Sequence, residues 1–327
     1  MIRAMSERSF VTVQNGEISL EVAVQGSGPL MLCIHGWPEL WYSWRHQMDH
    51  FSDRYTVAAM SVRGYGNSSN PTEIEPYALR ELTNDAAAVI DALGDGSGIV
   101  LGHDWGAPIA WNTARLHADK VSAVCGLSVP YIPTGPDNSL DLWRERYTAN
   151  DKFFYQVYFD DNRGSAEAEL GADHKRSLRM IYFGASGEGN AERGLLADKP
   201  ASAKMLDDMV DPDPFPSWCT PEDFDVYAAG FEASGWHGPL NRYRAQPLDA
   251  ADIGQLPDPN LKQPAAFIGG ELDPVRNFAP GIDMYDFAAM ACDDYRGTTI
   301  IDGAGHWVQQ EAPEATNAAL DAFVADL

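Results

Sequence analysis

A strand-to-helix turn around Asp104 constrains this chain more than any other stretch. Residues 99–107 read IVLGHDWGA, an apolar run that turns through an acid into a predicted helix. Gly102 and Gly106 flank the acid, and a backbone that turns this tightly needs small residues there. The spacing is typical of a nucleophile elbow, with Asp at the position where Ser is usual. A structural alternative is that Asp104 only caps the following helix.

The apolar segments of the chain predict an α/β architecture. Two alternating runs on either side of Asn15-Gly16 predict an opening β-hairpin. The later runs are short, continuously apolar and separated by helical patterns, which favours a mostly parallel eight-stranded sheet with helices on both faces. A last amphipathic helix is expected over 313–327. The predicted strands are 9–14, 18–25, 30–34, 55–62, 99–103, 121–129, 264–269 and 298–301.

The pattern changes after Pro130. Residues 131–250 contain no strand-like run, but they have many aromatic residues, short helical segments and Pro-rich turns. We therefore expect a helical lid over 131–250, inserted after the sixth strand. The remaining segments, 1–130 and 251–327, are expected to form the core.

Charge and hydropathy exclude several classes of partner. The formal net charge of −25 repels phosphate backbones and anionic lipid, so nucleic acid is not an expected partner. No uncharged apolar run reaches the roughly 18 residues of a membrane helix, so no membrane association is expected. The first ten residues lack the apolar block of a secretory signal, and we expect a cytoplasmic protein.

The four cysteines indicate neither a disulfide framework nor a metal site. Cys33, Cys125, Cys219 and Cys292 lie far apart and show no CxxC spacing. Cys33 and Cys125 fall inside predicted strands, where a buried, inert thiol is usual. We expect no metal and no cofactor.

Two further loops carry residues that complement Asp104. Asp273 follows one predicted strand, and His306 follows the next. In folds that carry a nucleophile elbow, the nucleophile comes first along the sequence, then the acid and then the histidine. In open α/β sheets, ligands bind where the parallel strands end. Glu271 lies two residues before Asp273 and is an alternative acid. The sequence therefore predicts a catalytic triad.

Seven segments resemble those of the α/β-hydrolase-fold epoxide hydrolases, and the resemblance runs from about residue 9 to the end of the chain. They are HGWPELWYSWRHQ (35–47), RGYGNSS (63–69), LGHDWGAPIAW (101–111), FYQVYF (154–159), GPLNRYR (238–244), GGELDPV (269–275) and GAGHWVQQE (303–311). Family position favours Asp273 over Glu271 as the acid. Some relatives place the acid after the sixth strand, where Ser128 of this chain cannot serve.

The residue types imply a two-step reaction. A carboxylate that attacks a saturated, electrophilic carbon forms an alkyl ester that water can cleave. Asp104 therefore implies an epoxide or a carbon–halogen substrate. His306, oriented by Asp273, would activate the water. By the logic of the fold, backbone N–H groups of Trp37 and Trp105 would hold the oxyanion.

The resemblance also implies a proton donor and a backbone feature. An epoxide oxygen leaves as an alkoxide, and tyrosine is a suitable weak acid for it. The positions that match the two lid tyrosines of the family are Tyr155 and Tyr243. A cis peptide bond is implied at Trp37-Pro38, which would turn the Trp37 amide toward the site.

Two alternative functions stay open at this point. One is a haloalkane or haloacid dehalogenase. Fluoroacetate-type enzymes carry Arg at the positions of Trp105 and Pro108, and haloalkane enzymes often carry Asn at the position of Trp37. The other is a non-catalytic receptor of the same fold, which would usually have lost part of the triad. We expect a small-molecule epoxide as the substrate, and a homodimer is possible.

Overall fold

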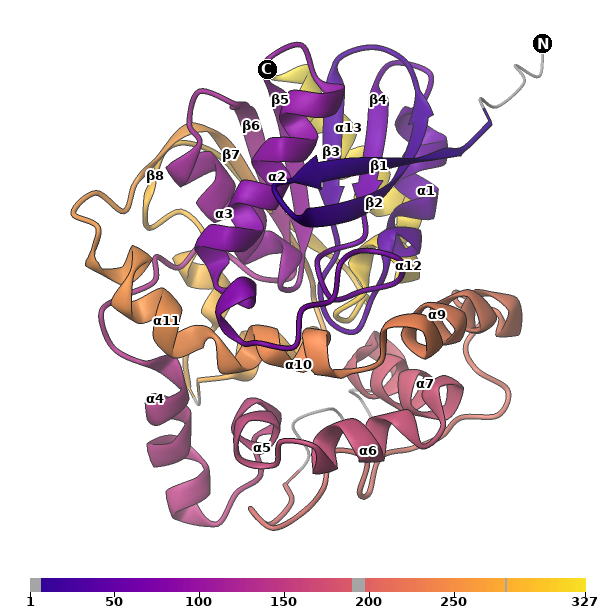
Figure 1. Cartoon of the computed structure of the whole chain (residues 1–327), viewed down its shortest axis with the longest axis vertical. Coiled ribbons are helices and arrows are strands. Elements are labelled where there is room, and N and C mark those ends of the chain that lie inside the picture. Colours follow the sequence, from indigo (N-terminus) through magenta and orange to yellow (C-terminus); the bar gives the residue numbers. More distant parts are fainter. Residues whose placement is uncertain (1–6, 190–197, 280) are drawn as a thin grey trace.

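The computed structural model describes residues 7–189, 198–279 and 281–327. Its centre is one eight-stranded sheet in the order β1-β2-β4-β3-β5-β6-β7-β8, shown in Figure 1. The strands are β1 (Ser9–Asn15), β2 (Ile18–Gly26), β3 (Leu30–Ile34), β4 (Thr56–Met60), β5 (Gly98–His103), β6 (Val121–Leu127), β7 (Leu261–Gly270) and β8 (Cys292–Ile301). From β4 to β8 all neighbouring strands are parallel. The predicted sheet is therefore confirmed.

The opening hairpin forms as expected. Asn15 pairs with Ile18 across the turn, and Gly16 has a φ of 60°, a left-handed conformation that glycine adopts without a side-chain clash. Strand β2 then runs antiparallel to β4, which joins the hairpin to the parallel part of the sheet.

Helices cover both faces of the sheet. The core helices are η1 (Trp41–Trp44), α1 (Arg45–Phe51), η2 (Glu75–Tyr77), α2 (Leu79–Leu93), α3 (Gly106–Leu116), η5 (Pro274–Asn277), η6 (Met284–Phe287), α12 (Val308–Glu311) and α13 (Pro313–Ala325). Helix α2 buries the stripe that its spacing predicts, including Leu82, Val89 and Ile90. It packs with α3 against one face. Helices α1 and α13 bury Met48 and Leu320 against the other.

A helical region is inserted between β6 and β7. It contains α4 (Ser139–Arg146), η3 (Thr148–Asn150), α5 (Tyr155–Asp161), α6 (Ser165–Gly171), α7 (His174–Ala185), α9 (Pro221–Ser234), α10 (His237–Arg244), α11 (Gln246–Ala251) and η4 (Ile253–Gln255). Figure 1 shows these helices gathered on one side of the core. The insertion after the sixth strand is confirmed, while its limits at 131 and 250 stay a prediction.

Two strands begin earlier than the apolar pattern predicts. Strand β8 starts at Cys292 instead of at residue 298, and most of its residues are exposed or half-buried. It is an edge strand, so its first residues, CDDYRG, pair with β7 without needing apolar side chains. Strand β7 likewise starts at Leu261. Among the described helices, none is both long and apolar enough to cross a membrane.

Candidate active site

Asp104 lies at the tip of the turn between β5 and α3. Its φ of 50° is in the left-handed region, which aspartate tolerates better than most residues, and only 8% of its surface is exposed. The flanking glycines leave no room for a side chain. A Cβ atom at Gly102 would lie 2.1 Å from the Gly106 carbonyl oxygen, and one at Gly106 would lie 2.0 Å from that of Ile34. The turn therefore requires the small residues that its sequence contains.

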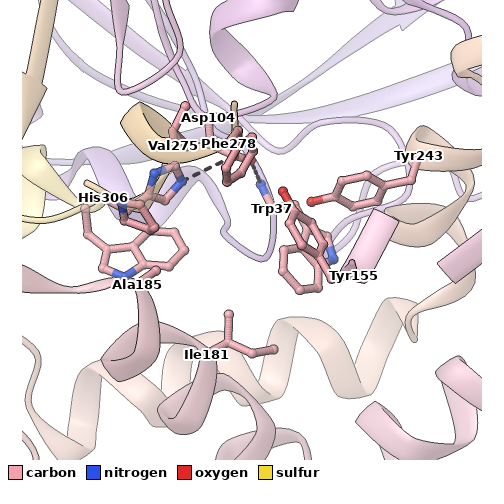
Figure 2. A pocket seen from close by; sticks show the side chains of 11 residues that line it. Trp37, Asp104, Tyr155, Ile181, Ala185, Tyr243, Val275, Phe278 and His306 are labelled. Carbon is pink, nitrogen blue, oxygen red and sulfur yellow. Dashed lines mark hydrogen bonds and ion pairs between the residues drawn. The ribbon is translucent and has the colours of Figure 1, made fainter. Parts of the chain in front are cut away.

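The three predicted triad residues meet at this turn. His306 Nε2 lies 3.2 Å from Asp104 Oδ2, and His306 Nδ1 lies 3.1 Å from Asp273 Oδ1. Figure 2 shows the His306 ring beside Asp104. All three side chains are buried. The loops after β5, β7 and β8 thus bring together residues that are far apart in sequence.

Asp273 rather than Glu271 faces the histidine. The Tyr285 hydroxyl donates to Asp273 Oδ2 at 2.7 Å, and the Val275 N–H donates to Oδ1 at 2.9 Å. Glu271 is exposed and accepts a hydrogen bond from the Gly303 N–H. The alternative acid therefore lies at the surface, outside the triad contacts.

The charges of the triad shift its pKa values in opposite directions. Burial opposes the charged form of His306, but the carboxylates of Asp273 and Asp104 outweigh burial and raise the pKa of His306 well above its usual value. Burial would raise the pKa of Asp273, but the charge and hydrogen bond of His306 outweigh burial and lower it. The surroundings of His306 therefore favour its protonated, imidazolium form.

A backbone donor faces the other oxygen of Asp104. The Trp37 N–H donates a 2.7 Å hydrogen bond to Asp104 Oδ1. The predicted cis peptide bond between Trp37 and Pro38 is present. Gly36 permits the close approach, because a Cβ atom there would lie 2.4 Å from the Asp104 side chain. Trp105, the other expected donor, is the N-terminal cap of α3, and its role stays a prediction.

The two predicted tyrosines lie in the inserted region. Tyr155 begins α5 and Tyr243 lies in α10, and their ring centroids are 5.6 Å apart. Figure 2 shows both hydroxyl groups on the side of Asp104 away from His306. Burial and then the negative charge of Asp104 raise the pKa of Tyr155, and burial, Tyr155 and Asp104 raise that of Tyr243. Both side chains are therefore protonated at neutral pH and can donate a hydrogen bond.

Buried residues behind the site hold the His306 loop in place. The Ser128 hydroxyl donates to the His306 carbonyl oxygen at 2.6 Å, and His103 Nε2 lies 2.7 Å from the same oxygen. His103 Nδ1 pairs with Glu39 Oε2 at 2.7 Å. Burial alone would raise the pKa of Glu39, but the charge and hydrogen bond of His103 hold it at about 2. Ser128 thus supports the histidine loop instead of carrying the acid.

Sequence reasoning did not find several of these supporting residues. The predicted site residues did not include Tyr285, Glu39 or Gln156. Tyr285 contacts Asp273, Gln156 contacts Tyr155, and Glu39 contacts His103, which supports the His306 loop. The Gln156 amide donates to the Tyr155 hydroxyl oxygen at 3.2 Å. The adjacency of His103 to Asp104, and of Gln156 to Tyr155, was the available signal. No sequence pattern indicated Tyr285, because its contact with Asp273 depends on how η6 packs in the folded protein.

Five of the predicted residues line one cavity: Trp37, Asp104, Tyr155, Tyr243 and His306. Asp273 lies behind His306 and is fully buried. Within the described residues, no group of three or more His, Cys, Asp or Glu side chains is arranged to hold a metal ion. The arrangement places a buried carboxylate beside a histidine–aspartate pair and two tyrosine hydroxyls, groups that could serve as a nucleophile, a base with its acid partner and two weak acids.

Comparisons with known proteins agree in fold and family. The α/β hydrolase fold model matches residues 29–180. Epoxide hydrolase A of Mycobacterium tuberculosis is 36% identical over 96% of this chain and 97% of its own length. Epoxide hydrolase B of the same organism is 35% identical over 92% of each chain. A solved epoxide hydrolase from an endophytic Streptomyces superposes with a TM-score of 0.90 at 37% identity, covering 99% of this chain and 96% of that one.

Proposed function

The chain belongs to the α/β-hydrolase-fold epoxide hydrolases, and we propose that it converts an epoxide to a vicinal diol through an ester on Asp104. One observation carries the mechanism. Asp104 has a base on one side, His306 at 3.2 Å, and two tyrosine hydroxyls on the other. This arrangement suits a substrate whose leaving oxygen needs a proton.

The first step forms the ester. Asp104 Oδ2 attacks one ring carbon, the bond between that carbon and the epoxide oxygen breaks, and its electron pair moves to the oxygen. Tyr155 or Tyr243 transfers its proton to that oxygen. The products are an alkyl ester with a neighbouring hydroxyl group and a tyrosinate. The raised pKa of both tyrosines keeps the donor protonated until the alkoxide forms. The alkoxide is a stronger base than the tyrosinate, so it takes the proton.

The second step hydrolyses the ester. Esterification removes the negative charge of Asp104, one of the two carboxylates that raise the pKa of His306. The pKa of His306 therefore falls, and its proton passes to the tyrosinate, which restores the tyrosine. The neutral His306 then takes a proton from water as the water oxygen attacks the ester carbonyl. The carbonyl carbon–alkoxy bond breaks, and His306 returns its proton to the departing diol oxygen. The remaining water proton, left on the Asp104 carboxyl group, returns to His306 and restores the starting ion pair.

Backbone donors stabilise the tetrahedral oxyanion. The Trp37 N–H already points at Asp104 Oδ1 from 2.7 Å. Negative charge develops on that oxygen during hydrolysis, so the hydrogen bond strengthens in the transition state, and Trp105 supplies a second N–H. Removing one such donor typically costs about 10²–10³-fold in rate.

The ester is directly testable. His306→Gln is incubated with a panel of epoxides, digested and analysed by peptide mass. We expect an adduct of the mass of the epoxide on the peptide that carries Asp104. The control is the same variant with Asp104→Asn, which preserves the left-handed backbone and carries no nucleophile. Absence of the adduct together with unchanged turnover would contradict the mechanism.

A product assay separates this function from dehalogenation. Wild-type protein is given epoxides and haloalkanes in parallel, and diol and halide release are measured. Diol formation without halide release is expected, because the two tyrosines serve an oxygen leaving group. Halide release as the faster reaction would favour the dehalogenase alternative.

A further inference from the structure

The space around Asp104 is divided into two unequal compartments. The histidine compartment has a cavity volume of about 20 Å³, and its lining includes His306, Trp307, Ile181, Ala185, Trp37 and Tyr243. The large compartment, lined by Trp105, Pro108, Val129, Trp143 and Met284, has a volume of about 250 Å³. Asp104, Tyr155, Val275 and Phe278 line both. These four residues therefore form the neck between the two compartments, and Asp104 is one of them.

The large compartment continues outward. Val129, Pro130 and Ile132 also line a further cavity of about 390 Å³, which reaches Leu142. Ile132 and Leu142 are 42% and 52% exposed, so this end approaches solvent. An apolar channel thus leads from the nucleophile toward the surface, and it offers room for an extended substituent.

The polar side chains of the large compartment are already paired with one another. The Ser139 hydroxyl donates to Gln246 Oε1 at 2.6 Å, and Gln246 Nε2 donates to Gln156 Oε1 at 3.1 Å. Gln156 in turn donates to the Tyr155 hydroxyl oxygen. An apolar substituent can therefore enter without leaving these groups unpaired, which would otherwise carry a penalty.

The histidine compartment has a different occupant. Its volume of about 20 Å³ suits one water-sized group, since a water molecule needs roughly 10–15 Å³. Tyr243 lines this compartment and not the large one, so that group is the epoxide oxygen in the first step and the water in the second. His306 lines this compartment and not the large one. The water that His306 activates therefore has its place here. A substituent that extended into this compartment would displace that water and slow the hydrolysis of the ester.

We propose that the preferred substrates are epoxides with one extended apolar substituent, whose other ring carbon carries only hydrogen. This inference rests on the proposed epoxide opening. The substituent occupies the channel that begins at Trp105 and Val129, and the unsubstituted side faces the histidine compartment. The shape of the site thus selects terminal over internal epoxides.

Two isomeric epoxides test this selection. Hexyloxirane and trans-dipropyloxirane have the same atoms, but the second places a propyl group on each ring carbon. We expect kcat/KM to be at least about tenfold higher for hexyloxirane, a discrimination that a hydrophobic pocket can supply. Equal values, or faster turnover of the internal isomer, would overturn the inference.

Variants of each compartment sharpen the test. Ile181→Ala enlarges the histidine compartment and should raise the turnover of dipropyloxirane relative to hexyloxirane. Leu178→Ala is the matched control, because Leu178 is buried on the same helix, α7, outside the lining of both compartments. An unchanged ratio in Ile181→Ala, or the same shift in both variants, would contradict the assignment.

A third variant tests the channel. Val129→Trp should lower kcat/KM for hexyloxirane by about tenfold or more relative to kcat/KM for methyloxirane, whose substituent does not reach this position. Equal losses on both would contradict the channel. Absence of turnover on every epoxide, methyloxirane included, would overturn the proposed function and this inference with it. Turnover of methyloxirane without selection between the isomers would overturn this inference alone.

Discussion

The Trp37 N–H holds Asp104 Oδ1 at 2.7 Å, which leaves Oδ2 as the oxygen that faces His306 at 3.2 Å. The two carboxylate oxygens therefore have separate roles. In the proposed mechanism, Oδ2 bonds to the epoxide carbon, and Oδ1 stays at the Trp37 N–H, which would stabilise the oxyanion. This division also determines the origin of the oxygen in the product.

An isotope experiment follows from this division. One turnover in heavy-oxygen water, with enzyme in excess, should give diol without the heavy isotope, because the new diol oxygen comes from Asp104. The heavy atom should appear in the peptide that carries Asp104. Mass analysis of diol and peptide measures both. Heavy diol in the first turnover would show that water attacks the epoxide directly.

Replacing both tyrosines should suppress the first step. Tyr155→Phe with Tyr243→Phe is expected to slow ester formation by about 10²–10⁴-fold, the usual contribution of a general acid. Each single change should have a smaller effect, because the other hydroxyl remains. Stopped-flow or quenched single-turnover kinetics measures the rate. Tyr158→Phe is the control, since that hydroxyl, also on α5, donates to Glu169 at 2.6 Å. Rates unaffected by the double change would remove the acid role.

The raised pKa of His306 predicts a pH-dependent contribution to stability. The folded protein binds the His306 proton more tightly than the unfolded chain, whose histidine has a pKa of about 6.5. The stabilisation is complete below that pH and is lost as pH rises through the higher folded pKa. His306→Gln should therefore lower the free energy of unfolding more at about pH 6 than at strongly alkaline pH. Urea unfolding of both proteins measures this, and a growing difference at high pH would contradict it.

Gly106, two residues after Asp104, should be required for the full stability of the fold. Gly106→Ala places a Cβ atom 2.0 Å from the Ile34 carbonyl oxygen, so β3 and α3 must separate, at a cost of about 1–3 kcal/mol or more. Gly135→Ala is the control, because a Cβ atom there meets nothing within 4 Å. Its effect should stay within about 0.5 kcal/mol. Thermal unfolding of the two variants checks the difference, and equal stability would contradict the steric argument.

The sequence was most informative where apolar strands end in polar loops. Asp104, Asp273 and His306 follow such strands, and parallel strands place their ends at one edge, so their meeting could be predicted. The start of β8 could not, because an edge strand needs little apolar surface. The contact of Tyr285 with Asp273, and the pairing of His103 with Glu39, depend on how distant segments pack. The unequal compartments depend on side-chain volumes from six or more elements, which no local pattern encodes.

The tyrosines and the nucleophile belong to different parts of the chain. Asp104, Asp273 and His306 lie on loops of the sheet core, whereas Tyr155 and Tyr243 lie on α5 and α10 of the insertion. In the proposed mechanism, the scaffold thus supplies the group that forms the new bond, and the added helices supply the proton for the leaving oxygen. On the proposed mechanism, grafting a different insertion onto this scaffold would preserve the nucleophilic carboxylate and change only which leaving groups can be protonated.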